Sequence, residues 1–209
     1  MAIRKILEYP QYEKSLRKTS KPVEVFDAKV KKLFRDMKDT VKSRPAVGLA
    51  APQIGVHRQV IVVRLGQSED GEGKLQEPMV IVNPEILEEQ PPVRGYDACL
   101  SIPDLYGYTN RPGVLRVQGR DEDGKLQEWT FEEMDARAVH HEIDHLQGVL
   151  FIDHIQDFNE DLFMIVEDEE GELEYVPFAL YLAQNPEDHR WQQVMPQEKA
   201  NLKQFDFER

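Results

Sequence analysis

Residues 132–148 read EEMDARAVHHEIDHLQG, and this stretch predicts the central helix of the fold. Acidic residues in its first turn favour the positive N-terminal end of a helix, and Gly148 stands where a left-handed C-terminal cap is expected. We therefore expect a helix from Glu132 to Gln147.

Segments before this helix have the composition of strands. Residues 59–65 and residues 78–88 are rich in β-branched side chains, and Pro84 indicates an edge or a bulge in the second. Residues 115–131 contain two further strand-like runs around an Asp-Gly pair, which is common in tight hairpin turns. Strands followed by one long helix predict an α+β fold, with antiparallel β-sheets packed around the central helix.

An earlier amphipathic helix is also expected. Asp27 is placed to cap its start, and it should end near Ser43 to Pro45. Its apolar residues recur at the i, i+3, i+4 spacing of one buried helix face, namely Val30, Leu33, Phe34, Met37 and Val41.

The chain after the central helix has a different character. Residues 161–166 and 172–178 flank an acidic turn and predict a hairpin, while residues 185–209 are polar and interrupted by proline. We expect one main domain at residues 1–154 and an acidic C-terminal extension at residues 155–209.

Charge is unevenly distributed along the 209 residues. The formal net charge is −13, and residues 153–209 hold 15 acidic side chains against 4 basic ones. Such a surface repels nucleic-acid phosphates, so direct nucleic-acid binding is not expected. No stretch approaches the roughly 18 apolar residues of a membrane span, and the N-terminus lacks an apolar run of signal-peptide length. We expect a cytoplasmic protein with no membrane association.

The central helix carries the motif HExxH, in which His141 and His145 lie one turn apart. Residues at i and i+4 share a helix face, so the two imidazoles can converge on one metal ion. Glu142 lies about 100° around the same turn, where it is better placed as a general base than as a third ligand. The alternative is an exposed helix face with unrelated histidines. That surface interpretation is also given to His57, His140, His154 and His189.

A catalytic site of the zinc type takes three protein ligands and leaves one position open for water. Cys99 is the sharpest candidate for the third ligand, because it follows a strand in the turn-bounded segment CLSIP and thiolates bind such ions strongly. It is the only cysteine, which excludes an intramolecular disulfide. Two alternatives remain open: a downstream carboxylate such as Glu160 as the ligand, and Cys99 as a small buried hydrophobe.

Three segments together resemble the peptide deformylase family: VGLAAPQIG at 47–55, CLS at 99–101 and HEIDHLQG at 141–148. They stand in the order and at the spacing of that family. The resemblance runs from the N-terminus to about residue 154, and identifies residues 1–154 as a deformylase-like catalytic domain.

The resemblance implies that Cys99, His141 and His145 hold one divalent metal ion. Ferrous iron is the expected native ion, and zinc, nickel and cobalt suit the same ligands. Glu142 is implied as the acid and base of the reaction.

Further residues take roles from the same resemblance. Gln53 and the backbone N–H of Leu100 are implied as donors to the oxyanion. Backbone around Val47 and Gly48 is implied to pair with the substrate as an added strand, and Ala98 to line its channel.

The implied reaction is hydrolysis of the N-formyl group from the N-terminal formylmethionine of nascent polypeptides. The metal lowers the pKa of a water molecule, hydroxide attacks the formyl carbon, and Glu142 delivers the proton to the leaving amine, which releases formate. N-formylated peptides and nascent chains are therefore the expected partners.

Three positions depart from the usual family pattern. Ala46 and Ala98 stand where the family has glycine, and Asp97 stands where it has glutamate. These changes keep alternatives open: altered acyl or substrate specificity, or a silent metal-binding homologue. An HExxH endopeptidase is a further alternative. Family comparison also suggests that Arg111 braces the site by pairing with an acid such as Asp97 or Asp144.

Overall fold

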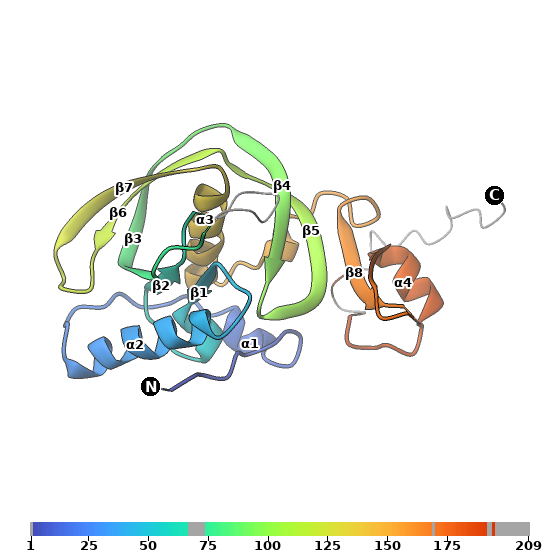
Figure 1. Cartoon of the computed structure of the whole chain (residues 1–209), viewed down its shortest axis with the longest axis horizontal. Helices are drawn as coiled ribbons and strands as arrows, with labels where there is room; N and C mark the ends of the chain where they lie inside the picture. The colour runs from blue at the N-terminus through green and yellow to red at the C-terminus, as the bar shows by residue number, and fades with distance from the viewer. Residues whose placement is uncertain (1, 67–73, 169, 192–193, 195–209) are drawn as a thin grey trace. The chain divides into compact units, whose positions relative to one another are not determined.

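The computed structural model describes residues 2–66, 74–168, 170–191 and 194 (Figure 1). The described residues form two compact units: one lies within residues 1–94 and 110–150, and the other lies within residues 95–109 and 151–209. Helices combine with antiparallel sheets in the structure, which confirms the predicted α+β class. No helix among the described residues is long and apolar enough to cross a membrane.

A five-stranded antiparallel sheet forms the main part of the first unit. The strands predicted at residues 59–65 and 78–88 and the hairpin at residues 115–131 are all present. In sheet order, the strands are β1 (Gly48–Ala50), β2 (Val60–Val63), β3 (Met79–Glu89), β6 (Val114–Arg120) and β7 (Leu126–Glu132).

Proline and glycine shape this sheet where the sequence indicated. The register of β3 against β6 shifts between Val82 and Glu85, so the bulge predicted at Pro84 is confirmed. Gly124 adopts a φ of +82° in the turn between β6 and β7, a backbone conformation that favours glycine. The sheet begins at β1, which pairs only with β2 among the strands of this sheet.

Two helices of the first unit begin and end close to the predicted positions: α2 (Ala28–Lys42) and α3 (Glu133–Gln147). A third helix, α1 (Glu13–Leu16), was not predicted, because 4 residues are too few to show a helical period. The Asp27 side chain accepts a hydrogen bond of 2.9 Å from the backbone N–H of Val30, which confirms the predicted cap. Gly148 ends α3 with a φ of +77°.

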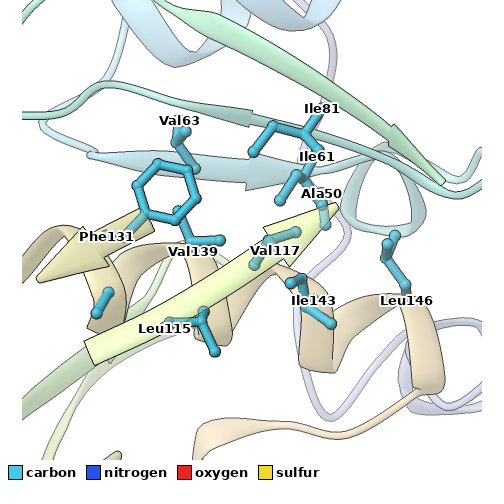
Figure 2. Close-up of a cluster of buried hydrophobic side chains, with 11 residues drawn as sticks. Ala50, Ile61, Val63, Ile81, Leu115, Val117, Phe131, Val139, Ile143 and Leu146 are labelled. Carbon is cyan, nitrogen blue, oxygen red and sulfur yellow. The ribbon is translucent and has the colours of Figure 1, made fainter. Parts of the chain in front are cut away.

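The core of the first unit lies between α3 and the sheet, and strands β3, β6 and β7 curve around the helix (Figure 1). Figure 2 shows Val139, Ile143 and Leu146 of α3 among the strand side chains. The spacing of these residues places them on one helix face. The cluster comprises Ala50, Ile61, Val63, Ile81, Leu115, Val117, Phe131, Ala136, Val139, Ile143 and Leu146.

The second unit is built on a four-stranded sheet. The predicted C-terminal hairpin is confirmed, because β8 (Leu162–Glu167) pairs antiparallel with β9 (Leu173–Pro177). They follow β4 (Pro92–Cys99) and β5 (Ile102–Pro112) in the order β4-β5-β8-β9.

Two short elements of this unit were not predicted. The 3-10 helix η2 spans Phe151–His154, and α4 spans Phe178–Gln184 immediately after β9. Sequence reasoning assigned Phe178 to the strand, because a helix of 7 residues shows too few turns for a clear period. The polar tail expected at residues 185–209 lies largely outside the described residues.

Asp36 ties the N-terminal segment to α2. Its buried carboxylate accepts hydrogen bonds from Lys32 Nζ at 2.7 Å and from Arg4 Nη1 at 3.3 Å. The hydrogen bond from Lys32 is the main cause that lowers the pKa of Asp36 below its ordinary value of 3.8, and burial opposes it. The ionised form is therefore favoured in the folded chain.

We expect Asp36→Asn to lower the free energy of unfolding by about 1 kcal/mol at neutral pH, because a charge-assisted hydrogen bond is lost. The folded pKa lies below the unfolded value, so this contribution is present above 3.8 and disappears as the pH falls through the folded pKa. Urea unfolding at neutral and acid pH measures both effects. Asp39→Asn on the same helix is the control, and an equal loss in that variant would contradict the role of Asp36.

Candidate metal centre

The two histidines of the HExxH motif lie on the side of α3 that faces away from the core. With about 100° per residue, they fall roughly opposite to Val139 and Ile143 around the helix axis. Both are buried, at 6% exposure for His141 and 1% for His145, and their ring centroids are 5.0 Å apart. The pattern of core residues thus directs both imidazoles to one place.

A group of three side chains in the described part of the chain can hold a metal ion. Cys99, His141 and His145 are all buried, and their ligand atoms lie within 4.8 Å of one another. One thiolate and two imidazoles form a donor set that suits zinc, ferrous iron and similar divalent ions. The residues therefore fit one divalent metal ion with three protein ligands.

Glu142 lies between the two histidines in sequence and is itself buried, at 5% exposure. Its carboxylate packs against Gly48 of β1: a Cβ atom added at Gly48 would be 2.3 Å from Glu142 Oε1. Real Cβ atoms do not approach an oxygen so closely. Gly48 is thus required for space, and it lets the carboxylate lie against the first strand of the sheet.

Gln53 is fixed by the short helix η1 (Ala51–Ile54), which follows β1 directly. The side chain is 1% exposed, and its Oε1 accepts a hydrogen bond of 2.7 Å from the backbone N–H of Ala50. Because a backbone N–H can only donate, this contact fixes which half of the amide is oxygen. The NH2 group is the half that can donate to another partner.

Arg111 is the most buried charge near α3, with a side-chain exposure of 0%. It donates a 2.7 Å hydrogen bond to Asp144 Oδ2, which confirms the predicted pairing with that acid. It also lies 2.6 Å from His140 Nδ1, and His140 Nε2 lies 3.3 Å from Glu89 Oε1.

The interpretation of His140 as a surface residue is therefore wrong. Its side chain is only 14% exposed, and it lies between Arg111 and Glu89. One signal in the sequence pointed to this position, because His140 and Asp144 are spaced i, i+4 and share a face of α3.

The segment around Cys99 also has polar support. Asp97 is buried at 5% exposure and accepts a 3.0 Å hydrogen bond from Thr109 Oγ1. Sequence reasoning missed Thr109, because nothing in the order of residues indicates which residue of β5 faces β4. Among the remaining candidates, Ala98 is exposed and Leu100 is half-buried.

Comparison with known protein families gives one consistent result. The family described as polypeptide deformylase matches residues 3–161. A peptide deformylase of Zymomonas mobilis is 41% identical over 165 residues, which is 78% of this chain and 92% of that protein.

Solved structures give the same result. The crystal structure of a peptide deformylase from Legionella pneumophila matches with a TM-score of 0.66 and 42% identity, over 74% of this chain and 87% of that chain. A class I type b peptide deformylase from Acinetobacter baumannii with bound Met-Ala-Ser matches with a TM-score of 0.68 and 31% identity, over 74% of this chain and 99% of that chain.

We expect Arg111→Ala to lower the free energy of unfolding by about 3 kcal/mol, because it leaves a largely buried carboxylate without its charged partner. Arg116→Ala is the matched control: Arg116 pairs with Glu88 and Glu128 at 3.5 and 3.7 Å, but its side chain is 46% exposed. Removal of such an exposed pair should cost about 0.5 kcal/mol or less. Urea unfolding of both variants provides the comparison, and equal losses would contradict the importance of burial at Arg111.

Proposed function

Because the chain belongs to the polypeptide deformylase family, we propose that Cys99, His141, His145 and Glu142 carry its reaction. The enzyme hydrolyses the N-formyl group of nascent polypeptides. The observation that carries the assignment of residues is the grouping of Cys99 with the two motif histidines, whose ligand atoms lie within 4.8 Å of one another.

Cys99, His141 and His145 would hold the metal ion in this proposal. A divalent ion bound there supplies Lewis acidity and lowers the pKa of water enough to give hydroxide near neutral pH. We propose ferrous iron as the native ion, with zinc, nickel or cobalt able to take the same ligands. Metal analysis of protein purified without oxygen tests this choice.

Glu142 would move the proton. Its carboxylate is buried beside Gly48 on the same turn of α3 as the histidines, so it can accept a proton as the nucleophile forms and deliver it to the amine that leaves. Transfer to the amine nitrogen completes the cleavage of the formyl C–N bond. Formate and a free N-terminal amine are the products.

Gln53 and the backbone N–H of Leu100 would stabilise the oxyanion. The contact from Ala50 N–H fixes the orientation of the Gln53 amide, so the position of its NH2 group is set before the substrate binds. Donors that are fixed before the reaction stabilise developing charge at least cost.

The substrate peptide would add to β1 as a further strand. This strand begins the five-stranded sheet and has a neighbouring strand of that sheet on one side only. Val47 and Gly48 would supply backbone hydrogen bonds, and Ala98 would line the channel. The related enzyme of Acinetobacter baumannii binds Met-Ala-Ser, which supports N-formylated peptides of similar sequence as substrates here.

We propose residues 1–154 as the catalytic domain and residues 155–209 as an acidic extension. The family match ends at residue 161, which supports a boundary in this region. Nascent chains carry formylmethionine where they are synthesised, so the proposed place of action is the cytoplasm. The acidity of the extension argues against direct binding of nucleic acid.

Formate release from a formyl-Met-Ala-Ser peptide tests the proposal, with protein purified anaerobically. We expect Glu142→Gln to keep the metal and the fold but to lower kcat by about 100-fold or more, because the amide cannot transfer the proton. Unchanged kcat in this variant would contradict the role of Glu142.

Parallel assays separate the alternatives. Turnover of the matching acetyl peptide instead of the formyl peptide would indicate altered acyl specificity, and cleavage of casein would indicate an endopeptidase. Stoichiometric metal with no turnover of any of these substrates would indicate a silent homologue.

We expect Gly48→Ala to lower kcat/KM by about 100-fold, because the new methyl group displaces the Glu142 carboxylate by roughly 1 Å. The double variant Gly48→Ala/Glu142→Ala lacks the three Glu142 side-chain atoms that the new methyl group would meet, so it relieves this contact. It should therefore unfold at a higher temperature than Gly48→Ala alone. Full activity of Gly48→Ala would contradict the close packing of these two residues.

A further inference from the structure

We propose that His140 and Glu89 are positioning residues for the deformylation reaction. Through Arg111, they fix the rotation of α3 about its axis and so hold His141 and His145 in place. The inference rests on the proposed roles of those two histidines, and it extends them to residues that touch neither the metal nor the substrate.

The direction of each hydrogen bond follows from the chemistry of arginine. Arg111 can only donate, so His140 Nδ1, at 2.6 Å from it, must accept. An imidazole with an accepting Nδ1 carries its proton on Nε2, which lies 3.3 Å from Glu89 Oε1. His140 thus accepts from Arg111 as a neutral ring, and the nitrogen that carries its proton lies beside the Glu89 carboxylate.

The same guanidinium also forms a hydrogen bond with a second residue of α3. Arg111 Nη1 donates to Asp144 Oδ2 at 2.7 Å, one helical turn from His140. The guanidinium comes from β5, and Glu89 ends β3. A single chain of polar contacts therefore attaches α3 to two strands.

The geometry of the helix explains why this attachment affects the metal site. His140 and Asp144 form one stripe along α3, and His141 and His145 form another, about 100° further around. An imidazole nitrogen lies roughly 6 Å from the helix axis, so a rotation of about 10° would move it by roughly 1 Å. Metal and catalytic sites need groups held within about 0.5 Å.

The apolar core alone does not fix this rotation so closely. Val139, Ile143 and Leu146 pack on one side of α3, and such side chains can adjust to a small rotation. The guanidinium of Arg111 is fully buried and requires its partners in defined directions. Polar contacts on a second stripe thus add the directional constraint that apolar packing lacks.

The experiment compares His140→Ala, His140→Gln and Glu89→Ala in the full chain. We expect His140→Ala to weaken the binding of cobalt(II) to the metal-free protein by about 10-fold and to lower kcat similarly, with KM nearly unchanged. His140→Gln should restore most of the cobalt affinity and most of kcat, because its amide oxygen can accept from Arg111 and its NH2 can donate to Glu89. Glu89 is 47% exposed, so Glu89→Ala should have a smaller effect, about threefold.

Glu88→Ala is the matched control. Glu88 precedes Glu89 on β3 and carries the same charge, but it pairs with Arg116 at 3.5 Å instead of with α3. We expect this variant to bind cobalt(II) like the wild type. The thiolate-to-cobalt absorption band provides a direct readout of the ligand geometry. It should weaken or shift in His140→Ala, change less in Glu89→Ala, and stay as in the wild type in Glu88→Ala.

Two outcomes would overturn the proposal. In the first, His140→Ala binds cobalt(II) with the affinity and the absorption band of the wild type. In the second, His140→Gln unfolds at the temperature of the wild type but does not regain the wild-type cobalt affinity and absorption band. Cobalt binding is measured without substrate. Absence of formate release by the wild type would therefore overturn the proposed function and leave the test of His140 intact.

Discussion

The packing of one face of α3 against the five-stranded sheet is the constraint on which the site depends. Burial of Val139, Ile143 and Leu146 against the strands stabilises the unit, and it also determines which side of the helix faces the core and which side faces away from it. The opposite face presents His141 and His145. The same apolar contacts that form the core thus also place two ligands of the proposed metal centre.

Around this core, the site collects polar groups whose burial is unfavourable unless they have partners. Arg111 donates hydrogen bonds to Asp144 and His140. The side-chain oxygen of Gln53 accepts from Ala50 N–H, and the Asp97 carboxylate accepts from the Thr109 hydroxyl. Each contact fixes a donor or acceptor direction as well as satisfying a buried group. Orientation before substrate binding is what electrostatic catalysis requires.

The departures from the family pattern have different consequences. Asp97 is one methylene shorter than glutamate, yet it remains buried and accepts from Thr109. Ala98 is exposed, so its methyl group is available to contact a peptide, and Ala46 is half-buried next to Val47. None of these departures replaces a proposed ligand or Glu142, and of the three positions Ala98 is the exposed one.

The sequence by itself determined α2 with its Asp27 cap, α3 with its Gly148 cap, both hairpins and the bulge at Pro84, because these depend on local periodicity and turn chemistry. It also predicted that Cys99, His141 and His145 form a group able to hold a metal ion, since HExxH spacing and family segments need no knowledge of contacts. Only the tertiary structure decided that Arg111 donates a hydrogen bond to Asp144 and that the His140 ring lies against Arg111. It also decided that the Glu142 carboxylate packs where a side chain at position 48 would lie. Those contacts join residues far apart in the chain, and their geometry depends on how strands and helix pack together.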